Sequence, residues 1–207
     1  DEAARTTFAK NIKTVLEKNK LDGIDLDFEW AENEKEYKDY SLAILKMREV
    51  LGDKYLFSVS LHPVCYKISK EAIEAVDFIS LQCYGPSPVR FPIEKYCSDI
   101  QMVLEYGIPK EKLVAGVPFY GVTKDNSKKT EAYFNFVQNG LVTSPAQNEV
   151  IYQGDTYVFD GQDNIRIKTR YAKEQKLKGM MSWDLATDLP LSDSRSLLKT
   201  MTEELRE

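Results

Sequence analysis

The sequence predicts an α/β fold and, within that class, part of a (β/α)8 (TIM) barrel. Short apolar segments alternate with segments of helical period, and connections this long favour parallel strands joined by right-handed crossovers. No glycine fingerprint follows the first strand, which counts against a dinucleotide-binding sheet. Polar residues lie at the carboxyl ends of the predicted strands, which is where the catalytic residues of barrel enzymes lie: Glu29, His62, Tyr84, Tyr120 and Asp184.

The predicted elements follow from the period of the apolar residues. Residues 3–19 place Phe8, Ile12, Val15 and Leu16 on one helical face, and an acidic strand follows at 21–29. The next predicted elements are a helix over 34–51, a strand over 56–62, a short helix over 70–75 and a strand over 77–85.

The second half begins with a loop that contains Pro86, Pro88 and Pro92. Residues 122–161 are polar, aromatic and turn-rich, and we interpret them as an excursion from the loop after the preceding strand. The other predicted elements are a helix over 93–106, a strand over 113–121, a helix over 165–175, a strand over 180–185 and a helix over 192–204.

The chain is expected to form one domain, 1–207, that is incomplete as a barrel. A (β/α)8 barrel typically needs about 250 residues and eight strands, whereas this chain of 207 residues offers five strand candidates and opens with a helix. We therefore predict the C-terminal part of a barrel, about five βα units. The missing strands would come from upstream sequence or a partner chain, because unpaired strand edges are a liability in soluble proteins.

Composition excludes several classes of function. The chain is 43% hydrophobic and 29% charged, with a net charge of −5 and no basic run, so nucleic-acid binding is not indicated. No apolar stretch reaches the roughly 18 residues of a membrane span. Cys65, Cys83 and Cys97 are odd in number and show no C-x-x-C pairing, so neither a disulfide framework nor a zinc site is indicated. The first residues carry no signal peptide, so any export signal either lies upstream or does not exist.

An acidic row with a period of two residues is the strongest chemical signal. Residues 22–29 read DGIDLDFE, and on a strand this alternation sends three acids to one face. Carboxylates this close repel each other, so at least one should keep its proton to unusually high pH and serve as a general acid. The three acids are Asp25, Asp27 and Glu29, and Ile24, Leu26 and Phe28 alternate with them.

Three other interpretations of this row were weighed. A solvated strand face is disfavoured, because the apolar neighbours and Trp30 indicate a mostly buried element. A calcium loop of EF-hand type, counted from Asp25, needs Gly at its sixth position, where Trp30 stands. A magnesium site that uses two of the acids stays open, although no glycine-rich phosphate loop accompanies it.

Four segments, in chain order, resemble motifs of one known family. Residues 22–29 resemble the D-G-x-D-x-D-x-E signature of glycoside hydrolase family 18, the chitinases and endo-β-N-acetylglucosaminidases, on the fourth strand of a TIM barrel. Residues 82–85 (QCYG), 116–121 (GVPFYG) and 181–185 (MSWDL) resemble its sixth, seventh and eighth strands. The resemblance covers essentially the whole chain and implies strands four to eight of the catalytic barrel.

The resemblance implies a retaining glycosidase that cleaves β-1,4-linked N-acetylglucosamine polymers by a substrate-assisted mechanism. Glu29 would protonate the leaving oxygen, Asp27 would accept the acetamido N–H, and Asp25 would share a proton with Asp27. No cofactor or metal is expected. The resemblance also suggests a secreted, periplasmic or cell-surface protein. Tyr84 would hold the acetamido oxygen, and Trp183, Tyr120, Gln82 and Asp22 would bind substrate.

Departures from the family pattern keep other functions open. Gly85 stands where many members have Asp or Asn, and Val122 stands where Arg is frequent, so contacts near the cleavage point are expected to be lost. A lectin on the same fold, an endo-β-N-acetylglucosaminidase or a peptidoglycan-trimming glycosidase are the alternatives. The only histidine, His62, is interpreted as a polar residue at the rim. Six aromatic residues of the excursion would be either stacking platforms or a small core: Tyr133, Phe134, Phe136, Tyr152, Tyr157 and Phe159.

Overall fold

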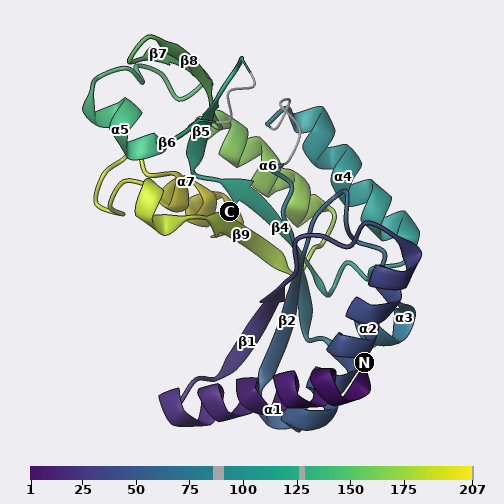
Figure 1. Ribbon diagram of the computed structural model, residues 1–207. Helices are drawn as coiled ribbons and strands as arrows, with labels where there is room; N and C mark the ends of the chain where they lie inside the picture. Colours follow the sequence, from purple (N-terminus) through teal and green to yellow (C-terminus); the bar gives the residue numbers. More distant parts are fainter. Residues whose placement is uncertain (86–90, 126–128, 207) are drawn as a thin grey trace.

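A five-stranded parallel sheet forms the centre of the molecule (Figure 1). The computed structural model describes residues 1–85, 91–125 and 129–206. The strand order is β1-β2-β3-β4-β9, so β1 and β9 form the two edges. The strands are β1 (Gly23–Asp27), β2 (Leu56–Leu61), β3 (Phe78–Leu81), β4 (Leu113–Pro118) and β9 (Gly179–Trp183).

Helices connect the parallel strands, and α2, α3, α4 and α6 lie along one side of the curved sheet (Figure 1). The first turn of α2 is capped by side chains: the Asn33 side chain accepts the Glu36 N–H at 3.0 Å, and Glu36 accepts the Glu32 N–H at 2.8 Å. The α-helices that accompany the parallel sheet are α1 (Glu2–Asn19), α2 (Glu34–Leu51), α3 (Lys70–Ala75), α4 (Ile93–Tyr106), α6 (Gln162–Glu174) and α7 (Leu197–Arg206), and the 3-10 turns are Gly52–Lys54 and Leu185–Thr187.

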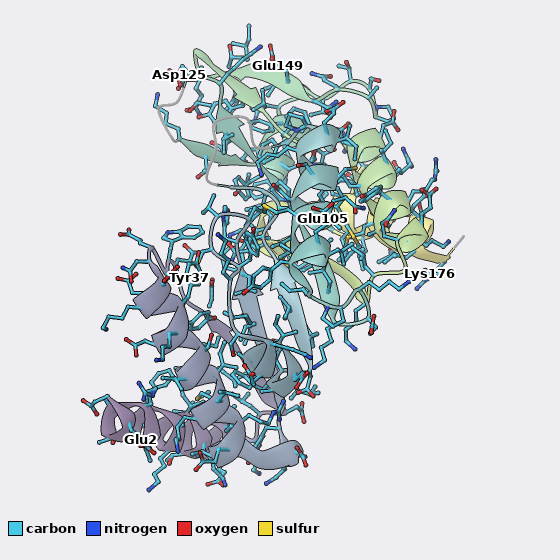
Figure 2. All side chains as sticks on the ribbon, turned by 90° about the vertical axis from the view of Figure 1, so that its right-hand side faces the viewer. Glu2, Tyr37, Glu105, Asp125, Glu149 and Lys176 are labelled. Carbon is cyan, nitrogen blue, oxygen red and sulfur yellow. The ribbon has the colours of Figure 1, made fainter. Side chains whose placement is uncertain are left out.

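A second, antiparallel sheet follows β4, in the order β6-β5-β8-β7. Figure 2 shows Asp125 and Glu149 of this region at the far end of the molecule from Glu2 of α1. Its aromatic residues form a core instead of stacking platforms, because four of them are buried: Tyr133, Phe136, Tyr157 and Phe159. The elements are β5 (Tyr120–Thr123), β6 (Thr130–Ala132), α5 (Tyr133–Gln138), β7 (Glu149–Tyr152) and β8 (Asp155–Val158).

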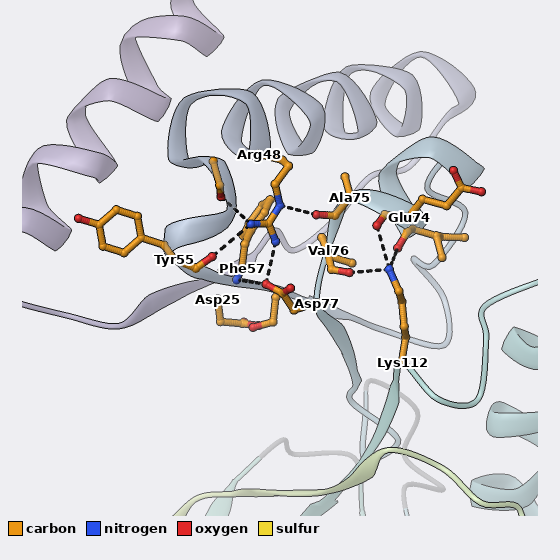
Figure 3. Close-up of polar contacts among 12 residues, drawn as sticks. Asp25, Arg48, Tyr55, Phe57, Glu74, Ala75, Val76, Asp77 and Lys112 are labelled. Atoms are coloured by element: carbon orange, nitrogen blue, oxygen red, sulfur yellow. Dashed lines mark hydrogen bonds and ion pairs between the residues drawn. The ribbon is translucent and has the colours of Figure 1, made fainter.

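A polar network holds the amino ends of the parallel strands against α2 and α3 (Figure 3). The Arg48 guanidinium donates to the Asp77 carboxylate at 2.7 Å, and Asp77 also accepts the Phe57 N–H at 2.7 Å. Burial alone would raise the pKa of Asp77, but these two contacts outweigh it and hold that pKa below its usual value. Arg48 and Lys112 further donate to the backbone carbonyls of Gly52, Tyr55, Ala75, Ile73, Glu74 and Val76.

The structure confirms the partial barrel and corrects several boundaries. The five predicted parallel strands are present, and the sheet is open with two edges, as predicted. The predicted strand over 113–121 is wrong as one strand, because β4 ends at Pro118 and Tyr120 already belongs to the antiparallel sheet. The last helix begins at Leu197 instead of 192, after a turn in which Asp188 accepts the Leu197 N–H at 2.9 Å. Pro86 and Pro88 lie outside the described residues.

Candidate active site

A cleft of about 740 Å³ opens on the sheet face that carries the acidic row. Parallel pairing explains why distant segments meet there: Asp25 is in register with Ser58 of β2, and Asp27 is in register with Ser60. Ser60 is in turn in register with Ser80 of β3. The cleft is lined by Asp25, Asp27, Glu29, Trp30, Ser58, Ser60, His62, Phe78, Ser80, Gln82, Tyr84, Gly85, Tyr120, Met181, Ser182 and Trp183.

The three acids of the row all line this cleft, but they are exposed. The expectation of a mostly buried element is therefore wrong for these side chains. The reason is that β1 is an edge strand, so no neighbouring strand among the described residues covers its outer side. Glu29 lies two residues beyond the last residue of β1, at the mouth of the cleft. The edge position of β1 therefore leaves these acids in contact with solvent.

Asp25 is held from the neighbouring strand. Its two carboxylate oxygens accept hydrogen bonds from the Ser58 hydroxyl at 2.5 Å and from the Ser60 hydroxyl at 2.7 Å. A carboxylate fixed by two donors loses its freedom to reorient. Asp25 is thus the acid of the row that hydrogen bonds fix in place. Asp27 and Glu29 lie farther along the chain, at and beyond the carboxyl end of β1.

Asp27 has a pKa above its usual value. The main cause is desolvation in the cleft, and the negative charges of Glu29 and then Asp25 add to it. The Gln82 amide opposes the shift, because its Nε2 donates to both carboxylate oxygens at 3.2 and 3.3 Å. The net effect is a raised pKa for Asp27, which agrees with the expectation that at least one acid of the row holds its proton to higher pH.

Aromatic residues from three strand ends form the opposite wall. Tyr84 is buried, its ring meets Tyr120 edge-on at 6.5 Å, and its hydroxyl lies 3.9 Å from the Met181 sulfur. Burial raises the pKa of Tyr84, so the hydroxyl stays protonated and able to donate. Trp183 ends β9 and is 58% exposed. Such exposure argues against a packing role and leaves the indole face open to a ligand.

One predicted site residue lies elsewhere. Asp22 precedes β1, and its backbone carbonyl accepts the Leu56 N–H at 3.0 Å at the amino end of β2. The cleft and the acids open toward the carboxyl ends of the strands, so the fold does not bring Asp22 into the cleft.

Several residues of the cleft were not predicted as site residues from the sequence. Ser58 and Ser60 alternate along β2, which places both on the face that Asp25 and Asp27 share. This alternation was the available signal. His62 was predicted as a rim residue, but it is a buried residue of the cleft lining, and its Nδ1 accepts the Val64 N–H at 3.3 Å. Cys83 is buried and does not line the cleft, and burial raises the pKa of its thiol.

The described part of the chain contains neither a cluster of metal-ligating side chains nor a helix that could span a membrane. No group of three or more His, Cys, Asp or Glu side chains there is arranged to hold a metal ion. No helix over the same residues combines the length and the apolar character that a membrane span requires. Cys65, Cys83 and Cys97 are free thiols.

Comparison with known proteins identifies the family. The sequence profile of glycosyl hydrolases family 18 matches residues 1–188. The chain belongs to this family. "Probable chitinase 2" of Drosophila melanogaster is 23% identical over 89% of this chain. The chain spans 51% of the length of that family 18 relative, about half.

Solved structures of similar fold agree with this family 18 assignment. The chitinase ChiB of Flavobacterium johnsoniae is 27% identical, with a TM-score of 0.82, over 99% of this chain and 67% of that one. A chitinase-like agglutinin of Robinia pseudoacacia has the same TM-score of 0.82 at 19% identity, over 99% of this chain and 74% of that one. The second likeness shows the fold alone.

Proposed function

We propose that this chain carries the catalytic residues of a chitinase-like glycosidase, which cleaves β-1,4-linked N-acetylglucosamine chains with retention of configuration. One observation carries the proposal: Glu29 stands at the mouth of a cleft that also holds Asp27, Tyr84 and Trp183. Among the described residues, the acids that line this cleft all come from β1 and the two residues after it. An inverting mechanism needs a carboxylate across the sugar from the acid, which the described cleft does not offer.

In the proposed first step, Glu29 gives its proton to the glycosidic oxygen while the bond from that oxygen to the anomeric carbon breaks. The acetamido carbonyl oxygen of the substrate forms the new bond to the anomeric carbon. Asp27 accepts the acetamido N–H and stabilises the positive charge of the oxazolinium ion. The Tyr84 hydroxyl donates to the acetamido oxygen and aligns it under the anomeric carbon.

In the proposed second step, water attacks the anomeric carbon from the side that the leaving group vacated. Glu29 now takes a proton from this water. The bond between the acetamido oxygen and the anomeric carbon breaks, which opens the oxazolinium ring and restores the acetamido group. Two displacements at one carbon restore the original configuration. Trp183, with its exposed indole, would stack on the pyranose face throughout.

The stereochemistry of the first product tests this proposal. We expect the β-anomer as the first product of chito-oligosaccharide cleavage, observed by proton NMR before mutarotation. Oligosaccharides of plain glucose should be inert, because they lack the acetamido group that attacks. An α-anomer as the first product, or good hydrolysis of cello-oligosaccharides, contradicts the mechanism. Parallel assays on a glycoprotein and on muropeptides decide between chitin, N-glycan and peptidoglycan as substrate.

The pH dependence tests the proposed role of Asp27. Replacing Gln82 by Leu removes the hydrogen bonds that lower the pKa of Asp27, so this pKa rises further. Because Asp27 must be ionised to stabilise the cation, we expect the acidic limb of the kcat/KM profile to move to higher pH. Ser80→Ala, which changes another residue of the same cleft wall, should leave that limb in place. A limb that moves equally in both variants, or in neither, contradicts the assignment.

A lectin on the same fold is the second candidate. Gly85, which lines the cleft, and Val122, which is buried in an apolar cluster with Tyr84, offer no polar side chain, as a weakened catalyst would show. Glu29 discriminates the two, since a lectin has no use for a proton donor at the mouth of its binding site. Binding of chito-oligosaccharides without any turnover, in the parent chain with intact Glu29, favours the lectin.

We also propose that the active protein covers the edges of β1 and β9 with further strands, supplied upstream in the same polypeptide or by a partner chain. Unpaired edges of a parallel sheet are avoided in soluble proteins. Two phenylalanines near β1 are half-exposed and fit such coverage, Phe8 at 42% and Phe28 at 44%. A secreted, periplasmic or cell-surface location would suit a polymeric substrate of this kind.

A further inference from the structure

Glu29 lies in a segment without regular structure, so its position depends on side-chain contacts. β1 ends at Asp27 and α2 begins at Glu34. The six intervening residues have no strand partner that would fix their path. Catalysis by a general acid requires its carboxyl to stay within hydrogen-bond reach of the leaving oxygen. The contacts of the residues that directly follow Glu29 therefore matter.

Those contacts come from the turn after β2, residues 62–65. The ring of His62 meets the ring of Trp30 edge-on, with 4.4 Å between the ring centres. The Ala31 N–H donates to the Cys65 sulfur at 3.1 Å, and both residues are buried. The turn therefore holds the two residues that follow Glu29, one by a ring contact and one by a hydrogen bond.

The turn itself is rigid. His62 and Cys65 exchange two backbone hydrogen bonds, at 3.2 and 2.7 Å, and the His62 Nδ1 accepts the Val64 N–H at 3.3 Å. The Tyr37 hydroxyl donates to the Val64 carbonyl at 3.3 Å and ties the turn to the first turn of α2. A turn closed in this way can act as a fixed support for its neighbours.

The other side of His62 faces Gly85, the residue after Tyr84. A Cβ atom at position 85 would lie 3.3 Å from the His62 Nε2, closer than most such contacts in proteins. Gly85 thus leaves the space that the imidazole occupies. The imidazole ring stands between the segment that follows the acid and the segment that follows Tyr84, and both Glu29 and Tyr84 line the cleft.

From this geometry we infer that His62 is a positioning residue for Glu29: it fixes Trp30 from the turn 62–65, and Gly85 leaves room for it, since a Cβ at position 85 would press on the His62 Nε2. The inference rests on the proposed function for its catalytic consequence, but not for the contact itself. The inference also explains why Gly stands at position 85, where many family members have Asp or Asn: the absence of a side chain leaves space for the imidazole of His62.

A double-mutant cycle on His62 and Gly85 tests this inference. Gly85→Ala should lower kcat on chito-oligosaccharides by about 10- to 100-fold with little change in KM, because a displaced acid affects only the transition state. His62→Asn should lower kcat similarly, since its Oδ1 can still accept the Val64 N–H but it lacks the ring edge toward Trp30. In the His62→Asn background, Gly85→Ala should cost nothing further. Gly179→Ala is the matched control, because an added Cβ there meets no atom within 4 Å.

A spectroscopic arm keeps the inference separate from the proposed function. The chain has two tryptophans, so Trp183→Phe leaves Trp30 as the only indole reporter. In that background, Gly85→Ala should shift the Trp30 emission and its quenching by acrylamide, and adding His62→Asn should abolish any further response to Gly85→Ala. His62→Ala repeats the cycle if the Asn variant does not fold. These outcomes hold even if the parent chain hydrolyses nothing.

Three results overturn the inference. The first is additive losses, in which Gly85→Ala costs the same with and without His62. The second is a rise in KM at unchanged kcat, which would make His62 or Gly85 a substrate contact. The third is a Trp30 emission that ignores both substitutions, which would mean that the ring contact does not fix Trp30.

Discussion

Replacing Glu29 by Gln is expected to lower kcat on chito-oligosaccharides by about 10²- to 10⁴-fold, the usual effect of losing a general acid. The amide keeps the size of the carboxyl but cannot give a proton to the leaving oxygen. Binding should survive, because Tyr84, Trp183 and Asp27 still line the cleft. The measurements are kcat for hydrolysis and the Kd for chito-oligosaccharides by calorimetry.

Glu32→Gln is the matched control for this prediction. Glu32 is an exposed acid three residues beyond Glu29 and does not line the cleft. The same chemical change there should leave both kcat and Kd near their parent values. If Glu29→Gln hydrolysed chito-oligosaccharides at the parent rate, another group would have to supply the proton, and the proposed assignment would be lost.

The fold was predictable where local period and topology agree. The alternation of apolar residues predicted the helix over 34–51 to the residue, and it predicted the five parallel strands within a few positions. Strand ends were predicted too long, because residues such as Glu29 and Tyr84 continue the pattern after the ladder has ended. Hydrogen bonding to a neighbouring strand sets the end, and a single segment does not contain that information.

The antiparallel sheet was not predicted as a sheet, because the pairing of β5 with β8, which joins its two hairpins, is non-local. β5 lies between β6 and β8, and Val122 pairs with both Thr130 and Val158. The turn from the parallel sheet into this one occurs at Phe119, inside what reads as one continuous apolar run. Only the tertiary packing of the aromatic residues determines where one sheet ends and the other begins.

The order of the motifs predicted which residues gather in the cleft, but it did not predict the hydrogen bonds from Ser58 and Ser60 that hold Asp25. Side-chain alternation placed Asp25 and Asp27 on one face, and parallel register brought Gln82 to Asp27. The exposure of the acids depends on which strand lies beside β1, a fact that β1 itself cannot encode. Asp22 shows the converse limit, since a residue of the same motif does not line the cleft.

The largest loss of stability is expected when the buried ion pair between Lys168 and Asp160 is broken. The Lys168 ammonium lies 2.5 Å from the Asp160 carboxylate, and these side chains are 1% and 0% exposed. The ammonium also lies 5.5 Å from the centre of the Tyr96 ring. Burial raises the pKa of Asp160, and Lys168 together with the Asn164 amide opposes that shift.

Lys168→Met therefore leaves a buried carboxylate without its counter-ion, and we expect a loss of about 3–5 kcal/mol in the free energy of unfolding. For a chain of this size the Tm should fall by on the order of 10 °C. The deficit should grow as the pH rises above about 4, the unfolded pKa of an Asp, because the folded pKa is raised and the neutral acid is the form that tolerates burial.

The double variant Lys168→Met with Asp160→Leu separates a missing charge partner from a packing defect. If the uncompensated carboxylate causes the loss, removing it should restore most of the stability, since apolar pairs can replace buried ion pairs at little cost. Lys35→Met breaks an exposed pair, in which Lys35 lies 2.8 Å from Asp39, and should leave the Tm unchanged. Thermal unfolding followed by circular dichroism measures all three. A Lys168→Met variant as stable as the parent, or a double variant as unstable as the single one, would show that packing around α6, and not this charge pair, determines the stability of this region.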